Sequence, residues 1–315
     1  MITDRIDSVT SIPPEFQKAV LPPPPAVKVE LTAACDFKCF FCATSQDLRV
    51  KRHMDFDLFK RIARDMRDSG VHELGLFYLG ESFLYPRLVD AVRYAKGELG
   101  FPYVFITTNG RMATPERVRG CIEAGLDSLK FSINYADAEQ CKEVTRVDGY
   151  ATVLSNLQWA RLIRDDVAAR TGKRCGLYAS SIWYNAEQEH RMKPLLDKIA
   201  GLVDEHYWLP LYDSAGYTLA AEKARGLTPV VGSIGRFASM RDPLPCWTAF
   251  REGHVTADGK LSACCFDHEG KYTIGDLTQQ GFMEAWNSET AQRLRAAHLR
   301  HDLTGTVCEG CVGHV

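Results

Sequence analysis

The chain has 315 residues, of which 45% are hydrophobic and 25% charged, and its formal net charge is −2. This composition is typical of a globular protein with a full core, and the charge gives no reason to expect nucleic acid or an anionic membrane as a partner. No apolar run is long enough to span a bilayer, and the first residues lack the basic and apolar regions of a secretory signal. We therefore expect a cytoplasmic protein.

The chain begins with a segment, residues 1–26, that ends in a run of prolines and is expected to be an extended, polyproline-like lead-in. Strand and helix patterns then alternate six times over residues 27–212. Helices are expected at 55–69, 86–97, 115–124, 137–145, 150–166 and 187–202. Strands are expected at 27–31, 73–78, 103–107, 128–133, 176–181 and 207–211. This order predicts an α/β fold with a parallel sheet, a partial (β/α)6 TIM-like barrel.

The pattern changes after the sixth strand. Residues 213–245 are rich in Gly, Ala, Ser and Pro and are expected to be a connector. Residues 246–315 form a short, cysteine-dense segment with one helix expected at 288–299. This second domain is too small for a large core, so we expect a metal centre to stabilise it.

Eleven cysteines are many for such a chain, and eight of them fall into two groups, at 35–42 and 246–311. Without a secretory signal, this grouping favours metal ligation over disulfide bonds. The first group reads C-x3-C-x2-C and comprises Cys35, Cys39 and Cys42, directly after the first expected strand. Three thiolates on one loop can hold three irons of a cubane cluster and leave the fourth open to a small molecule. Half of a zinc site is the alternative.

This cysteine spacing after a strand resembles the radical S-adenosylmethionine (SAM) superfamily, and further motifs extend the resemblance over nearly the whole chain. Leu79-Gly80-Glu81-Ser82 is similar to the Gly-Gly-Glu-Pro motif whose backbone meets the SAM amino group, although Leu79 and Ser82 depart from it. Residues 107–110 (Thr-Thr-Asn-Gly) resemble the motif that lines the SAM site. The resemblance implies a [4Fe–4S] cluster held by three cysteines, SAM, and an electron donor such as flavodoxin or ferredoxin.

The same resemblance implies a role for individual residues of the SAM site. Phe41 matches the aromatic residue beside the adenine, and Ser132 and Asn134 lie where ribose contacts are found. Arg146 matches an arginine that faces the SAM carboxylate. Polar residues at strand ends can equally be turn formers. The implied SAM contacts are Phe41, Gly80, Glu81, Ser82, Thr108, Asn109, Ser132, Asn134 and Arg146.

The second cysteine group offers four thiolates for one complete site: Cys246, Cys264, Cys308 and Cys311. Four sulfurs alone do not separate zinc from iron–sulfur. The segment resembles the SPASM/Twitch extension of radical SAM enzymes, through these cysteines and the Asp258-Gly259 pair. That resemblance implies one auxiliary [4Fe–4S] cluster with four cysteine ligands.

Cys265 is left over beside Cys264. It could replace Cys264 as a ligand, pack as a small hydrophobic residue, or be a free thiol near the substrate. A free thiol there could give a hydrogen atom to a carbon radical.

We expect an enzyme whose 5′-deoxyadenosyl radical abstracts hydrogen from a small polyhydroxylated or amino-sugar-like natural product, such as a sugar or aminocyclitol. Epimerisation, with Cys265 as hydrogen-atom donor, is favoured over dehydrogenation of a secondary alcohol with the auxiliary cluster as electron acceptor. A peptide-modifying maturase and a non-catalytic metal scaffold are further alternatives. Aromatic and acidic residues near two strand ends could hold a sugar or close the core: Trp183, Tyr184, Trp208, Tyr212 and Asp213.

Overall fold

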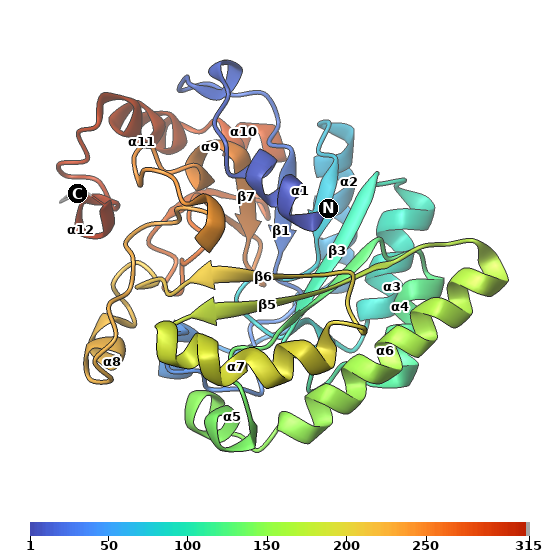
Figure 1. Ribbon diagram of the computed structural model, residues 1–315. Coiled ribbons are helices and arrows are strands. Elements are labelled where there is room, and N and C mark those ends of the chain that lie inside the picture. Colours follow the sequence, from blue (N-terminus) through green and yellow to red (C-terminus); the bar gives the residue numbers. More distant parts are fainter. Residues whose placement is uncertain (313–315) are drawn as a thin grey trace.

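The computed structural model describes residues 1–312. A nine-stranded sheet runs through the molecule in the order β6-β5-β4-β3-β2-β1-β7-β8-β9 (Figure 1). Strands β1 to β7 pair in parallel, whereas β8 and β9 are antiparallel additions at one edge. The strands are β1 Ala26–Val29, β2 Glu73–Gly75, β3 Tyr103–Thr108, β4 Ser128–Ser132, β5 Gly176–Trp183, β6 Glu205–Pro210, β7 Glu252–Val255, β8 Lys260–Ser262 and β9 Thr273–Asp276.

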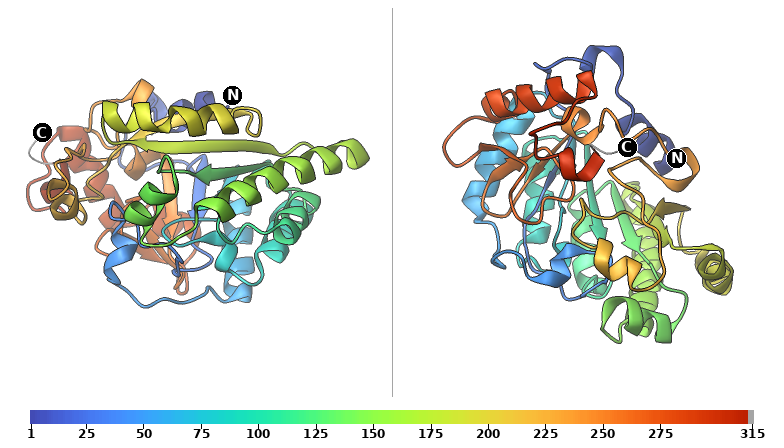
Figure 2. Two further views of the ribbon diagram at one scale, coloured as in Figure 1. Left: turned by 60° about the horizontal axis from the view of Figure 1, so that its bottom comes forward. Right: turned by 90° about the vertical axis from the view of Figure 1, so that its left-hand side faces the viewer.

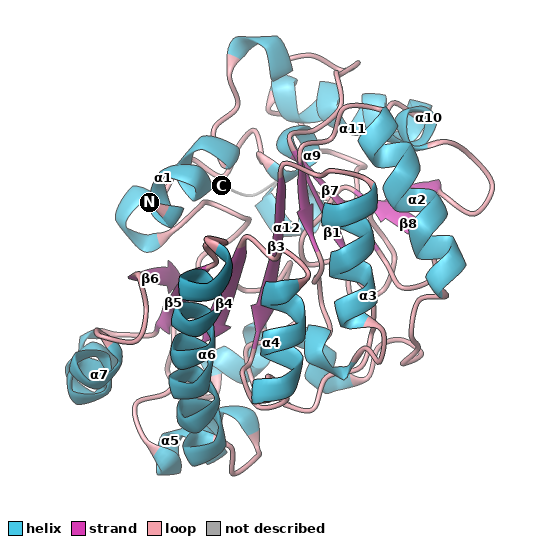
Figure 3. Ribbon diagram, turned by 90° about the vertical axis from the view of Figure 1, so that its right-hand side faces the viewer, coloured by secondary structure: helices cyan, strands magenta, loops and turns pink. Residues whose placement is uncertain are grey.

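Helices connect the parallel strands and cover the outer face of the sheet, which confirms the predicted α/β partial barrel. Figure 3 shows α3, α4 and α6 side by side on this face, as expected from right-handed β–α–β connections. The helices are α1 Ile2–Val9, α2 Phe56–Asp68, α3 Leu88–Arg93, α4 Pro115–Glu123, α5 Ala138–Thr145, α6 Tyr150–Thr171, α7 Ala186–Ile199, α8 Leu219–Lys223, α9 Thr248–Arg251, α10 Phe282–Trp286, α11 Glu289–Arg300 and α12 Glu309–Val312.

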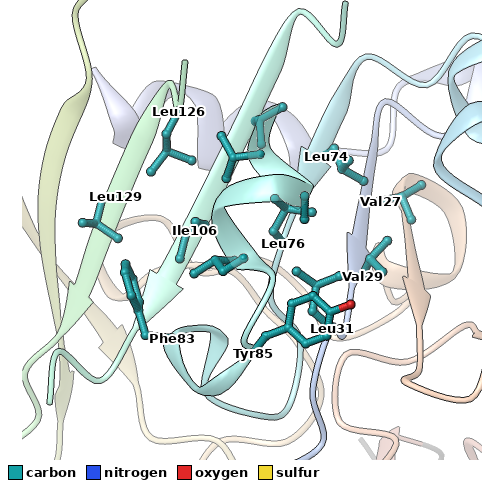
Figure 4. Close-up of a cluster of buried hydrophobic side chains, with 14 of the residues drawn as sticks. Val27, Val29, Leu31, Leu74, Leu76, Phe83, Tyr85, Ile106, Leu126 and Leu129 are labelled. Carbon is teal, nitrogen blue, oxygen red and sulfur yellow. The ribbon is translucent and has the colours of Figure 1, made fainter. Parts of the chain in front are cut away.

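The strands separate apolar from polar side chains because successive residues of a strand point to opposite faces. In β1, Val27 and Val29 are buried in the core between sheet and helices, together with Leu74 of β2 and Ile106 of β3 (Figure 4). Lys28, between the two valines, instead borders a cavity on the inner face. The same alternation repeats along the sheet, so the inner cavity receives the polar and aromatic side chains.

Local sequence signals locate most helices within a few residues. Asp55 is the N-cap of α2, and its Oδ1 accepts a hydrogen bond from the Leu58 N–H at 2.9 Å. Ser288 caps α11 in the same way. The helix expected at 86–97 begins at Leu88 and ends in a π-helical turn over Tyr94–Glu98.

The prediction that residues 1–26 are an extended lead-in is wrong for α1. Ile2, Ile6 and Val9 lie on one face of this helix and close the end of the inner cavity where the strands begin. The guanidinium of Arg5 lies 2.6 Å from the Glu73 carboxylate and 3.1 Å from the centre of the Tyr103 ring. The apolar stripe of such a short helix is hard to recognise in the sequence. The stripe is stabilised only when the folded chain places it over the starts of the strands.

The C-terminal segment continues the sheet instead of standing apart from it. Strand β7 pairs with β1, with Val27 opposite Gly253, so a strand near residue 255 borders the first strand of the chain. Helices α10 and α11 follow, and α10 packs against α2 (Figure 2). Main-chain hydrogen bonding therefore supports this segment in addition to any metal centre.

Candidate functional site

The loop with Cys35, Cys39 and Cys42 follows β1 and lies against the C-terminal end of α5. The N–H groups of Lys38 and Phe40 donate to carbonyls of Thr145 and Val144 at 2.9 and 3.1 Å. All three thiols are half-buried and free. Three free thiols on one anchored loop fit a cluster that is held by three cysteines.

Gly80 allows the loop after β2 to lie directly on the cysteine loop. A Cβ at this position would come within 2.0 Å of the Thr32 carbonyl oxygen and 2.8 Å of the Ala34 carbonyl oxygen. The next residue, Glu81, donates its N–H to the Ala34 carbonyl at 2.8 Å. Only glycine fits such a close approach of two backbones.

The Glu81 carboxylate joins the loops after β2 and β3. It accepts hydrogen bonds from the Thr108 hydroxyl (2.7 Å), the Asn109 N–H (2.7 Å) and the Phe83 N–H (3.0 Å). Burial raises the pKa of Glu81 to about 7, although these donors oppose the shift. The Glu81 side chain therefore holds the loops after β2 and β3 together from a buried position.

The structure brings several predicted SAM contacts to this end of the sheet, but some of their side chains are already engaged. The Ser82 hydroxyl donates to the Leu76 carbonyl at 2.8 Å, and Asn134 Oδ1 accepts from the Ile182 N–H at 3.0 Å. Thr108 is likewise bonded to Glu81, so each of these three side chains already makes at least one hydrogen bond within the protein.

The other predicted contacts keep more freedom. Ser132 is half-buried at the end of β4, and Phe41 lies edge-on to Phe40 at 5.3 Å between ring centres. Arg146 is exposed and ends α5 in a left-handed conformation (φ 60°) beside the cysteine loop.

Asp36 is a member of this site that sequence reasoning missed. Its carboxylate accepts from Asn109 Nδ2 at 2.7 Å and pairs with the Arg111 guanidinium at 2.9 Å. The same Asn109 amide lies 3.9 Å from the Cys35 sulfur. Its position inside the cysteine motif was the one available signal.

The second cysteine group surrounds a small enclosed cavity. Cys246, Cys308 and Cys311 border it, together with both Cys264 and Cys265. The Phe266 N–H donates to the Cys264 sulfur at 3.3 Å. His298 also borders the cavity, and its Nε2 is buried with no hydrogen-bond partner within residues 1–312. The thiols and this free imidazole nitrogen fit a sulfur-rich group.

Cys265 differs from Cys264 in one respect. It borders the thiol-lined cavity and also the large cavity on the inner face of the sheet, which Cys264 does not reach. Within residues 1–312, no three His, Cys, Asp or Glu side chains lie close enough together to hold a single metal ion. The choice between Cys264 and Cys265 as ligand therefore rests on spacing and on these two cavities.

The inner cavity has a volume of about 400 Å³ and lies on the barrel side of β1 to β7. Nine aromatic residues contribute to its walls: Phe77, Tyr78, Tyr103, Phe105, Tyr178, Tyr207, Tyr212, Trp247 and Phe266. Of the sugar-binding candidates from the sequence, Tyr212 lines it, whereas Trp183, Tyr184, Trp208 and Asp213 do not.

Charged groups meet in this cavity. The Lys28 ammonium lies 2.7 Å from the Glu252 carboxylate, which also lies 2.9 Å from His254 Nε2. Lys130 of β4 lines the same space, and burial together with the nearby Lys28 lowers its pKa to about 7.

A partial barrel with a cysteine loop after its first strand, followed by a second cysteine-rich site, defines a protein with two thiol-lined sites that could hold metal centres. The chain belongs to the radical SAM superfamily: residues 29–168 match the family model of the radical SAM superfamily, and residues 246–312 match that of SPASM, the iron–sulfur cluster-binding domain. This confirms the predicted family and its cofactors, a [4Fe–4S] cluster, SAM and auxiliary iron–sulfur binding.

Relatives of different activity share this framework. A GTP 3′,8-cyclase of Chlorobaculum tepidum is 29% identical over 271 residues, which cover 77% of this chain and 79% of the relative. The structure of BtrN in complex with AdoMet and 2-DOIA has a TM-score of 0.56 at 14% identity, covering 87% of this chain and 86% of BtrN. Streptococcus suis SuiB bound to its precursor peptide SuiA has a TM-score of 0.66 at 16% identity, covering 93% and 70%. The two structures support the fold alone. Among residues 1–312, no helix is both long and apolar enough to cross a membrane.

Proposed function

We propose that this radical SAM enzyme epimerises a carbon of a small polyhydroxylated or amino-sugar-like compound, with Cys265 as the hydrogen-atom donor. The observation that carries the proposal is the position of Cys265 between the inner cavity and the thiol-lined cavity. The aromatic walls suit the apolar faces of a sugar ring.

We propose that Cys35, Cys39 and Cys42 hold the first cluster, and that Cys246, Cys264, Cys308 and Cys311 hold the auxiliary one. When bound, the first cluster and SAM supply a 5′-deoxyadenosyl radical that removes a hydrogen atom from substrate carbon. The protein aims the substrate and holds SAM through the backbone around Gly80 and Glu81 and through Asn109. Phe41, Ser132 and Arg146 are the proposed adenine, ribose and carboxylate contacts.

Cys265 completes the proposed reaction on the opposite face of the substrate. Its S–H bond breaks, the hydrogen atom forms the new C–H bond, and a sulfur radical remains on Cys265. One electron from an external reductant and one proton from solvent restore the thiol. The substrate undergoes no net oxidation, and the hydrogen that it gains comes from an exchangeable thiol.

The test is turnover in deuterated water with reconstituted enzyme, SAM and dithionite. Wild-type product is expected to carry one solvent deuterium at the inverted carbon, and Cys265→Ala is expected to form 5′-deoxyadenosine without epimer. The matched control is Cys121→Ala, which removes a buried thiol on α4. Product without solvent deuterium rules out the epimerisation mechanism.

Dehydrogenation of a secondary alcohol is the second candidate, and the set of four thiols beside Cys265 favours it, because a closed cluster can accept an electron. A ketone product in the same assay would establish it. Peptide modification is the third candidate. A panel of peptides and GTP should be tested as substrates in the same assay. One relative is named as a GTP 3′,8-cyclase, and one structural neighbour is described as bound to a precursor peptide.

A further inference from the structure

We propose that the inner cavity contains a binding site for a carboxylate or phosphate group of the substrate, built around the ammonium group of Lys130. The inference rests on the proposed function for the position of the reacting carbon, and it narrows the substrate to acidic compounds. It starts from the charges that line the cavity.

Five charged side chains line the cavity: Arg5, Lys28, Glu73, Lys130 and Glu252. Four of them form two ion pairs, Arg5 with Glu73 at 2.6 Å and Lys28 with Glu252 at 2.7 Å. Within residues 1–312, Lys130 makes neither an ion pair nor a hydrogen bond through its amine. The centre of the Tyr207 ring lies 5.9 Å from its Nζ. Among the described residues, the cavity therefore holds one amine, that of Lys130, without an acidic partner.

The strand register explains why Lys130 faces the cavity. Lys130 pairs with Thr107 of β3 and with Tyr178 of β5, and both neighbours line the same space. The two neighbours of Lys130 in β4, Leu129 and Phe131, point to the opposite face and are fully buried. The amine therefore has no route to bulk solvent along the outer face, in contrast to most surface lysines.

The position along β4 fits one substrate of sugar size. Ser132, a proposed ribose contact of SAM, lies two residues closer to the C-terminal end of the strand on the same face. Two strand residues span about 7 Å. The two positions on the strand are therefore about one sugar-ring length apart.

Lys130 is half-buried, and an ammonium ion in this position without a counter-charge is unfavourable, as its lowered pKa reflects. A bound carboxylate or phosphate supplies the missing charge, whereas a substrate amine in the same place would be repelled. The cavity charge thus favours acidic over basic members of the proposed substrate class.

Lysine labelling on the reconstituted full chain with both clusters and SAM tests the proposal without turnover. Deuterated acetic anhydride acetylates amines, and mass spectrometry gives the rate at each lysine. Inorganic phosphate or unlabelled acetate is expected to slow labelling of Lys130 at least fivefold relative to chloride of equal ionic strength. Glucose is expected to change it less than twofold. Phosphate and acetate as separate arms distinguish a phosphate site from a carboxylate site. Equal effects at Lys130 and at exposed Lys198 would overturn the proposal.

A second measurement uses Lys130→Met, which keeps an unbranched side chain one atom shorter than lysine and removes its charge. The anion that protects Lys130 is expected to raise the Tm of wild type and of the control Lys198→Met, but not that of Lys130→Met. An equal rise in all three proteins would contradict the site. Neither readout depends on Cys265, so loss of the epimerase mechanism and loss of the anion site give different results.

Discussion

The Glu81 carboxylate accepts a 2.7 Å hydrogen bond from the hydroxyl of Thr108, and both groups are buried. This contact links two motif loops that are 27 residues apart in the sequence. Because Asn109 also bonds to Glu81, the position of the Asn109 side chain near Cys35 depends on the same carboxylate. A glutamate of the SAM motif thereby sets the geometry of the third-strand loop.

Replacing Glu81 with Gln is expected to lower the free energy of unfolding by about 1–3 kcal/mol. Glutamine has one acceptor oxygen, so its amide N–H2 would face a backbone or hydroxyl donor that then remains buried and unpaired. Urea unfolding of the apoprotein measures the effect. SAM affinity is expected to fall as well, and Glu187→Gln at an exposed position of α7 serves as the control. Equal stabilities for Glu81→Gln and wild type would contradict the role of the carboxylate.

Gly80→Ala is expected to be strongly disruptive. Its Cβ would lie 2.0 Å from the Thr32 carbonyl oxygen, so one of the two loops has to move, at a cost of about 1–3 kcal/mol or more. Iron content and SAM binding report the displacement of the cysteine loop. Gly97→Ala is the matched control, since a Cβ at that position would have nothing within 4 Å. Full cluster loading in Gly80→Ala would show that the close approach is dispensable.

Metal analysis separates the two cysteine sites. The reconstituted protein is expected to bind about eight irons and eight sulfides, in two cubane clusters. Joint replacement of Cys35, Cys39 and Cys42 by Ala should leave about four irons and abolish 5′-deoxyadenosine formation. Replacement of Cys308 and Cys311 should also leave about four, with the first cluster retained. One zinc in place of four irons would contradict an auxiliary cluster.

The pH dependence of stability should change in Lys130→Met. The folded-state pKa of Lys130 is lowered from 10.5 to about 7 by burial and by Lys28, so the unfolded chain binds more protons between these values. The contribution of this amine to stability therefore rises from pH 7 to pH 10. Urea unfolding should show Lys130→Met more stable than wild type at pH 7, with the difference shrinking at higher pH.

Other titratable groups that line the cavity around Lys130 could also change charge between pH 7 and pH 10. They are Tyr103, Tyr178 and Tyr207 from the neighbouring strands and Lys28 from β1. Burial raises the pKa values of the three tyrosines, so they stay neutral over most of the window. A constant difference between Lys130→Met and wild type from pH 7 to pH 10 would contradict the lowered pKa.

Most of the architecture was predictable from local signals. The alternation of strand and helix patterns gave the six β–α units, and residues such as Asp55 and Ser288 marked the starts of helices. The cysteine spacing and the motifs around Gly80 and Asn109 predicted the family and its cofactors. These features were readable because each depends on residues close together in the chain.

The contents of the inner cavity were not predictable in the same way. The sequence alone determined which cofactors the protein uses, through Cys35, Cys39 and Cys42 and the later cysteines. Only the tertiary structure decided that α1 closes the cavity, that β7 borders β1, and that Lys130 and Cys265 line the same space. The reason is physical: ligand spacing is a local property of the chain, whereas the charge and shape of a cavity arise from packing between residues more than a hundred positions apart.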